Sequence, residues 1–355
     1  MMKFKIILLA TFFCCFSVFA NELPDLGDSS QLIISAKEEQ AIAKAILKEV
    51  AVSPEIVQDI EVIDYLRNLG DRLVAYSPNK RQQFNFFVVN ESSINAFAML
   101  GGVIGVHTGL ILASNSESEV ASVLGHEIAH VTQRHLPRMI AQQKNDSIKT
   151  VLGIALALLV ARANPQLSAG TMTAASAMGV QKQLDYTREH EKEADRVGFQ
   201  ILTDAGFDGR SMVSFFNTLQ RGSRFSEGAA PSFLRTHPIT TDRISDISNR
   251  VKESRYRQIP DNPDFIFIKS KLRASNGTPQ SAVDEFEGSI KDKRYMNEAS
   301  ERYGLAIAYM RKSDFAKARQ EVEWLKTNTK KNALIETLGC KLEVSTNQPV
   351  QALNH

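Results

Sequence analysis

Three residues near the middle of the chain have the types and spacing of a metal site. His126 and His130 lie four residues apart, and Glu127 follows the first histidine directly. In an α-helix this spacing brings both imidazoles to one face, where they can bind the same metal ion. Glu127 is turned by about 100° from His126, which places its carboxylate beside the metal. We therefore predict a Zn²⁺ ion held by both histidines, with Glu127 as the general base that activates a zinc-bound water.

Acidic residues further along the chain offer a third ligand. Glu191 and Asp195 are four residues apart and share one helical face, whereas Glu193 points away from both. Glu191 is the predicted third ligand, and Asp195 is predicted to hydrogen-bond a ligand histidine and fix its tautomer. The alternative is an ordinary solvated charged helix, which the histidine pair upstream makes the weaker interpretation.

The other histidines give a less specific signal. His135 lies nine residues after His126, about half a turn around a continuous helix, so we expect a structural role near the helix end. His190 is expected to face away from the site. His237 precedes Pro238, which restricts the local chain direction, and the residues alone leave its role open.

Periodicity and capping signals predict the elements that position these residues. Ser35 with Glu38, and Ser116 with Glu119, have the spacing of helix-starting capping boxes. The expected elements are helices over 35–50 and 57–75, strands over 83–90 and 103–107, a helix from 116 to about 137 or beyond, and a polar helix ending near 206.

The composition describes an ordinary globular protein with an export signal. The 355 residues are 43% hydrophobic and 23% charged, and the net charge of +2 gives no indication of a nucleic-acid partner. Lys3 and Lys5 precede an apolar run that ends at Ala20, which is typical of a signal peptide cleaved after Ala20. A lipoprotein signal is the weaker alternative. Cleavage leaves Cys340 as the remaining cysteine, so the fold does not depend on disulfides.

A strongly apolar run covers residues 151–160. Ten helical residues reach only about 15 Å, half of a bilayer, so the run is too short to span a membrane. We favour a buried core helix and leave a peripheral membrane contact open.

The composition changes after Arg250, where a polar linker precedes paired helical patterns. Ala282, Ala318 and Ala352 each follow a turn signal and recur at intervals of roughly 34 to 36 residues. This period predicts a short or truncated tetratricopeptide-like solenoid with a concave binding face.

Four motifs stand in the order of a known family. They are Asn95-Ala96-Phe97-Ala98 with Gly101-Gly102, HEIAHVTQRH, YTREHEKEAD, and Thr236-His237-Pro238 with Arg243. On these motifs, residues 35–250 resemble the gluzincin metallopeptidases of the HtpX, Oma and prenyl-protein-protease group. The helical repeats extend the likeness to its periplasmic members that support β-barrel assembly. Leu100 departs from the family, which usually has proline there.

The resemblance assigns roles to individual residues. It implies that His126, His130 and Glu191 bind one zinc ion per chain, that Glu127 is the catalytic base, and that Asp195 supports a ligand. It also implies that His237 either stabilises the tetrahedral intermediate or occupies the open metal position in a latent state. Asn95 and Ala96 match the edge-strand segment that pairs with an extended substrate.

These observations predict an α+β protein. A mainly helical gluzincin metalloprotease domain with a small β-sheet, at 21–255, follows a signal peptide at 1–20. An all-α tetratricopeptide-like solenoid, at 256–355, completes the chain.

The expected function is that of a periplasmic zinc metalloendopeptidase that acts on misfolded or stalled outer-membrane proteins. Contact with the β-barrel assembly machinery through the repeats is left open. One alternative is a chaperone or scaffold whose proteolysis His237 keeps latent. A further alternative is a membrane-surface protease anchored by 151–160.

Overall fold

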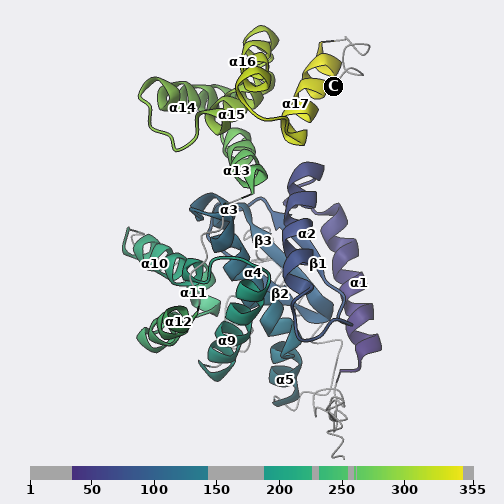
Figure 1. Cartoon of the computed structure of the whole chain (residues 1–355). Helices are drawn as coiled ribbons and strands as arrows, with labels where there is room; N and C mark the ends of the chain where they lie inside the picture. Colours follow the sequence, from purple (N-terminus) through teal and green to yellow (C-terminus); the bar gives the residue numbers. More distant parts are fainter. Residues whose placement is uncertain (1–33, 143–187, 226–231, 255–259, 261, 347–355) are drawn as a thin grey trace, which may run out of the picture.

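The computed structural model describes residues 34–142, 188–225, 232–254, 260 and 262–346 (Figure 1). Within these residues a three-stranded sheet has the order β1-β3-β2, formed by β1 (Asn85–Val89), β2 (Ala96–Met99) and β3 (Val103–His107). β3 pairs parallel with β1 and antiparallel with β2. The strand predicted over 103–107 is confirmed, and the strand predicted over 83–90 is shorter at both ends. β2 therefore lies at an edge of the sheet.

Helices cover both faces of this sheet. α1 (Ala36–Val52) packs Ile42 and Ile46 into one apolar cluster with Phe87 of β1. α2 (Ile60–Val74) belongs to a second cluster, which takes up the neighbouring strand residue Val88. Alternate strand residues thus face opposite layers, as the pleat requires. The predicted capping box at the start of α1 is confirmed, because Ser35 Oγ accepts from the Glu38 backbone and Ser35 N donates to the Glu38 carboxylate.

A short helix, α3 (Thr108–Ala113), leads from β3 to α4 (Glu117–Thr132), which carries His126, Glu127 and His130. Ser116 caps α4 by accepting from Glu119 N at 3.2 Å, but the Glu119 carboxylate accepts from Asn115 N at 2.7 Å, so only half of the predicted capping box forms. Every residue from 117 to 130 is buried, so α4 runs through the core. A carboxylate and two imidazoles are thereby held away from bulk water.

The prediction that this helix continues to about Pro137 is wrong. α4 ends at Thr132, Arg134 adopts a left-handed conformation with φ 53°, and α5 (His135–Gln142) begins immediately afterwards. A residue in this conformation cannot continue a right-handed helix. His135 consequently does not lie where a continuous helix would place it.

α9 (Arg188–Asp204) packs along α4 at very short range. Gly125 of α4 and Gly198 of α9 meet face to face, and a Cβ added at Gly198 would lie 2.9 Å from the backbone N and Cα of His126. The two helices can approach this closely because neither glycine carries a side chain. The same region continues with α10 (Arg210–Phe225), α11 (Ser232–Thr236) and α12 (Thr241–Glu253). We call residues 34–254 the α/β region.

A separate stack of helices follows and forms what we call the helical region, residues 262–346. It consists of α13 (Pro263–Ser275), α14 (Pro279–Lys291), α15 (Glu298–Arg311), α16 (Phe315–Asn328) and α17 (Ala333–Ser345) (Figure 1). The helices begin at nearly equal intervals. Ala282 in α14 and Ala318 in α16 are both buried, at 3% and 0% exposure. The third predicted repeat position, Ala352, lies outside the described residues.

α13 joins the two regions through an apolar contact. Phe265 and Ile268 of α13 belong to the same apolar cluster as Val62 and Leu66 of α2. The core of the α/β region therefore extends into the first helix of the helical region.

Charged groups reinforce this junction. Lys271 of α13 lies 2.6 Å from Asp59 Oδ2 and also pairs with Glu61 at the start of α2. Lys269 Nζ donates to Ser114 O at 2.5 Å, just before α4. The junction thus reaches the helix that carries the predicted metal site.

Two predicted segments lie outside the described residues, the signal peptide at 1–20 and the apolar run at 151–160. Among the helices that the structure describes, none is both long and apolar enough to cross a membrane.

Candidate metal centre and active site

The two histidines of α4 converge as their spacing predicts. His126 Nε2 and His130 Nε2 lie 3.0 Å apart, and the side chains are 3% and 1% exposed. Glu127 is fully buried, and neither of its carboxylate oxygens has a hydrogen-bond partner in the described part of the chain. A buried carboxylate without hydrogen bonds costs several kcal/mol. Its position beside the histidines therefore indicates a functional requirement.

α9 brings both predicted acidic residues to the same place. Glu191 Oε1 lies 3.4 Å from His130 Nε2, and its Oε2 lies 3.6 Å from His126 Nε2. Asp195 Oδ1 lies 3.0 Å from His126 Nδ1, on the side of the imidazole away from the cluster. Glu191 thus faces the nitrogens that can bind a metal, and Asp195 faces the other nitrogen of His126.

His237 also enters the site. Its Nδ1 lies 2.9 Å from Glu191 Oε1, and its Nε2 lies 3.6 Å from Glu127 Oε1. Phe233 stacks on the imidazole at 4.6 Å and 27°, and Phe233 N donates to Ile94 O at 3.2 Å. α11 is therefore attached to the chain just before β2, and His237 is held in place from that side.

These residues fit a zinc ion. His126, His130, Glu191 and His237 each offer one ligand atom, and the four atoms lie within 4.8 Å of one another. Imidazole nitrogens and a carboxylate are typical zinc ligands. The adjacent unpartnered carboxylate of Glu127 matches the need for a base beside the metal.

Arg243 of α12 supports this cluster from behind. It donates Nε and Nη2 to Asp195 at 2.6 and 2.7 Å, its Nη1 lies 2.7 Å from Glu191 Oε2, and Nη1 also donates to Pro238 O at 2.8 Å. The buried guanidinium of Arg243 therefore binds the carboxylates of Asp195 and Glu191 and the carbonyl of Pro238. The sequence contained Arg243 within a family motif, but its role became evident only from these contacts.

Burial and ion pairing perturb the pKa values of these groups in opposite directions. Burial disfavours protonation of His126, but Asp195 and Glu191 outweigh it and raise the pKa of His126 to about 9. Burial holds the pKa of His130 well below its ordinary value. Burial disfavours ionisation of Glu191, but the charge of His237 and hydrogen bonds from the imidazoles outweigh it and lower its pKa strongly. Glu191 is therefore ionised, as a metal ligand must be.

His135 and Glu193 form a second set of contacts behind His130. His135 Nδ1 lies 2.8 Å from His130 Nδ1, and His135 Nε2 lies 3.0 Å from Glu193 Oε2. His190 stacks on His135 at 4.5 Å. Burial lowers the pKa of His135 to about 4 despite the opposing effect of Glu193. The sequence could not indicate these contacts, because they depend on the break after α4.

The predicted substrate-binding residues lie at the edge strand. Asn95 and Ala96 are buried, at 1% and 0% exposure, and Asn95 O accepts from His107 N of β3 at 3.0 Å. They take no part in the metal-ligand cluster. Ala98 and Leu100 line a small hollow that reaches His130, which places the end of β2 next to the cluster.

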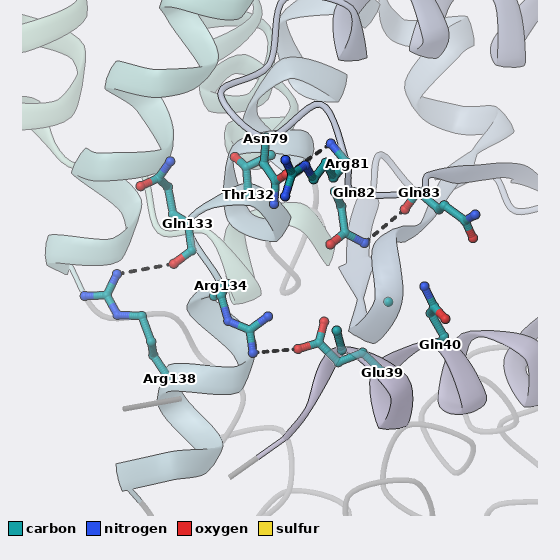
Figure 2. A pocket seen from close by; sticks show the side chains of 12 residues that line it. Glu39, Gln40, Asn79, Arg81, Gln82, Gln83, Thr132, Gln133, Arg134 and Arg138 are labelled. Carbon is teal, nitrogen blue, oxygen red and sulfur yellow. Dashed lines mark hydrogen bonds and ion pairs between the residues drawn. The ribbon is translucent and has the colours of Figure 1, made fainter. Parts of the chain in front are cut away.

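A larger cleft opens at the end of β2 (Figure 2). Its volume is about 590 Å³, and Glu39, Arg81, Gly101 and Gln133 are among its lining residues. An ion pair of 2.7 Å between Arg134 and Glu39 joins the turn after α4 to α1. This contact holds the left-handed turn at the mouth of the cleft.

Two packed helices bring two histidines and two buried glutamates together next to an edge strand, an arrangement that fits a zinc metalloprotease. The sequence comparisons agree with this class. Residues 63–251 match Peptidase family M48. The chain therefore belongs to peptidase family M48.

Individual relatives extend beyond the matched domain. The chain is 36% identical over 299 residues to the putative beta-barrel assembly-enhancing protease of Vibrio cholerae serotype O1, covering 84% of this chain and 62% of that protein. It is 31% identical over 345 residues to the beta-barrel assembly-enhancing protease of Escherichia coli strain K12, covering 96% and 70%. Mitochondrial metalloendopeptidase OMA1 of Arabidopsis thaliana is 33% identical over 151 residues, covering 42% and 28%.

Proposed function

We propose that this metalloprotease is a periplasmic zinc endopeptidase that acts in the quality control and assembly of outer-membrane proteins. The observation that carries the proposal is the convergence of His126, His130 and Glu191 in one buried group, with the buried Glu127 beside His126 in α4. The two relatives named beta-barrel assembly-enhancing proteases support the outer-membrane role. The predicted signal peptide at 1–20 supports the periplasmic location.

The proposed ligands of the zinc ion are His126, His130 and Glu191. When bound there, zinc supplies Lewis-acid activation of water and polarisation of the scissile carbonyl. Glu127 accepts a proton from the attacking water and returns it to the leaving amine. Its burial suits this role, since no hydrogen bond from the described residues occupies its lone pairs.

Two further parts of the site act on the substrate. His237, 3.6 Å from Glu127 through its Nε2, lies on the side where it can donate a hydrogen bond to the developing oxyanion. Asn95 precedes β2 and Ala96 is its first residue, and the outer edge of this strand can pair with an extended polypeptide. Strand pairing would place the substrate backbone next to Glu127 without demanding a particular sequence.

A second candidate function follows from the position of His237. Because its Nδ1 belongs to the same close group as the proposed ligands, it can also occupy the open metal position and keep proteolysis latent. The protein then acts chiefly as a chaperone or scaffold. In that case the helical region, which we propose is tetratricopeptide-like, would recruit the outer-membrane assembly machinery.

Substituting Glu127 tests the proposed mechanism. We expect Glu127→Gln to keep one zinc per chain and to reduce peptide-bond cleavage by about 100-fold or more. Glu189→Gln, at an exposed carboxylate of α9, is the matched control and should retain cleavage. Zinc content and the rate of cleavage of an unfolded outer-membrane protein are the measurements. Undiminished cleavage by Glu127→Gln would refute the role of Glu127.

Two variants separate the protease from the scaffold. His237→Ala should reduce cleavage if His237 stabilises the oxyanion, and should increase it if His237 blocks the site. The second variant is a chain that ends at Thr329. It lacks α17 but keeps α13, which packs into the core of the α/β region. If this shortened chain fails to rescue an outer-membrane defect that Glu127→Gln still rescues, the scaffold role is the principal one.

A further inference from the structure

The two proposed zinc histidines use different supports for their outer nitrogens. His126 Nδ1 faces a carboxylate, Asp195, at 3.0 Å. His130 Nδ1 faces instead another imidazole, His135, at 2.8 Å, and His135 in turn faces Glu193 Oε2 at 3.0 Å. His135 is fully buried, so water cannot substitute for either contact. His130 is therefore supported by two residues in series, His135 and then Glu193, whereas His126 is supported directly by a carboxylate, Asp195.

The positions of the protons in this chain follow from its donors and acceptors. His130 Nε2 faces His126 Nε2 and Glu191, so it is the nitrogen available to a metal, and its proton must lie on Nδ1. That N–H then donates to His135 Nδ1. His135 consequently carries its own proton on Nε2 and donates it to the Glu193 carboxylate. Each proton in this series of hydrogen bonds therefore has one position that suits both its donor and its acceptor.

We propose that His135 is a positioning residue that orients His130 for zinc, and that Glu193 fixes the tautomer of His135. The proposal rests on the assignment of His130 as a zinc ligand in the proposed function. It deepens that function by naming the support of the second ligand. Partners of this kind, on the nitrogen opposite the metal, set the ring orientation and basicity of a ligand histidine.

The break after α4 is what makes this contact possible. In a continuous helix five residues turn the chain through about 500°, which would direct His135 away from His130. Arg134 adopts a φ of 53° instead, a conformation that costs about 1–2 kcal/mol for a residue other than glycine. Arg134 is held there by Glu39 at 2.7 Å and by Ile34 O at 3.2 Å. The strained turn thus has a function, which is to bring His135 behind the ligand.

Glu193 is fixed in its turn by Arg138 of α5. Arg138 Nη1 donates to Glu193 Oε2 at 3.1 Å and to Gln133 O at 3.4 Å. The Glu193 side chain is 31% exposed, so the chain of contacts runs from the buried ligand out to the protein surface. Glu193, at the outer end of these contacts, can therefore be substituted with little disturbance of the core.

Zinc affinity, measured by competition with a chelator, tests the proposal. His135→Phe keeps the ring volume and removes both hydrogen bonds, and we expect its Kd for zinc to rise about 10- to 100-fold. His135→Asn keeps an acceptor near the position of Nδ1 and should recover part of that loss. Glu193→Gln should raise the Kd in the same direction by a smaller factor. The visible absorption spectrum of the Co²⁺-loaded protein should differ most from that of the wild type in His135→Phe, and less in His135→Asn.

Controls separate positioning from a general loss of stability. His107→Phe makes the same change at another buried histidine, which ends β3 and whose Nδ1 bonds to Ser93 Oγ, and should leave the Kd unchanged. His130→Ala should greatly weaken zinc binding. If it does not, the proposed ligand set is wrong, whatever His135 does.

Normal affinity in His135→Phe, with a defective His130→Ala, would overturn only the role of His135. An Asn variant as weak as the Phe variant would overturn it as well. If His135→Phe does not fold, an unchanged Kd in Glu193→Gln is the overturning result.

Discussion

The α/β region and the helical region both contain ion pairs, but they place them differently. In the α/β region Asp195 and Arg243 are 1% and 2% exposed and are separated by 48 residues in the sequence. In the helical region Arg302 pairs with Glu321 at a separation of 19 residues, and the two side chains are 21% and 15% exposed. The α/β region has exposed local pairs too, such as Arg67 with Asp64, but its catalytic centre joins fully buried charges from distant helices, whereas this pair of the helical region is partly accessible and joins neighbouring helices.

The difference reflects what each region has to do. A catalytic centre needs charged and polar groups in a place without water, where each group must be satisfied by specific partners. A stack of helices needs mainly contacts between neighbours, because each helix buries its apolar face against the next. Stability should therefore be sensitive to single changes around α4 and α9, and tolerant of similar changes in the helical region.

Arg243 offers the largest expected contrast. Arg243→Met leaves Asp195 and Glu191 buried without their cation, and we expect a loss of about 3–5 kcal/mol in unfolding free energy. The Kd for zinc should also rise by about 10- to 100-fold, because Asp195 no longer fixes His126. Urea unfolding and chelator competition measure the two effects.

An exposed ion pair of the helical region is the matched control. Arg294 and Asp292 are 70% and 52% exposed, so Arg294→Ala should change stability by about 1 kcal/mol or less. Equal losses in Arg243→Met and Arg294→Ala would contradict the distinction between the regions.

A pair of glycines gives the next contrast. Gly198→Ala puts a Cβ 2.9 Å from the His126 backbone, which must move because no flexible side chain can give way. We expect a loss of about 1–3 kcal/mol in stability from overpacking. Because α9 carries Glu191, a displacement of about 1 Å can also reduce cleavage by about 100-fold.

Gly288 of α14 has room for the same methyl group. Its added Cβ would meet Arg294 at 3.7 Å, an ordinary contact, and alanine is the better helix former. Gly288→Ala should therefore stabilise the chain by about 0.4–1 kcal/mol. Thermal unfolding and cleavage rates of both variants check the prediction, and a destabilised Gly288→Ala would show that the helical region is packed as tightly as the site.

The local elements and the spacing of the metal motif could be predicted because their causes are local. Ser35 and Ser116 cap the helices they were expected to start, and the four-residue spacings place His126 with His130 and Glu191 with Asp195. Helical periodicity is a property of neighbouring residues, so it can be recognised without a fold.

The failures concern contacts between distant segments. His237 reaches His126 across 111 residues, and nothing in the spacing of either residue indicates that contact. Pro137 disfavours a continuous helix here, but the left-handed turn at Arg134 also depends on Glu39 from another helix, which no local signal indicates. Family motifs supplied the place of His237, but they gave no role to His135, Glu193 or Arg243.

The smallest predicted effect concerns Asp59, at the junction between the regions. Burial alone would raise the pKa of Asp59, but Lys271 outweighs it and holds the pKa below its ordinary value of 3.8. A carboxylate with a lowered pKa in the folded state stabilises the protein above its unfolded pKa, and this contribution disappears as pH falls through the folded value. Asp59→Asn keeps the cap on Glu61 N and Val62 N but removes the charge.

The urea midpoint of Asp59→Asn should therefore lie below that of the wild type near pH 7, and the difference should shrink as pH falls below about 4. Asp314→Asn is the matched control, because Asp314 caps α16 and lies 3.9 Å from Lys317. The Asp314–Lys317 pair is more exposed than the Asp59–Lys271 pair, so the urea midpoint of Asp314→Asn should differ less from that of the wild type at every pH. A pH-independent difference for Asp59→Asn would mean that the charge of Asp59 does not stabilise the junction, and that Lys271 contributes through Glu61 and through its packed methylenes.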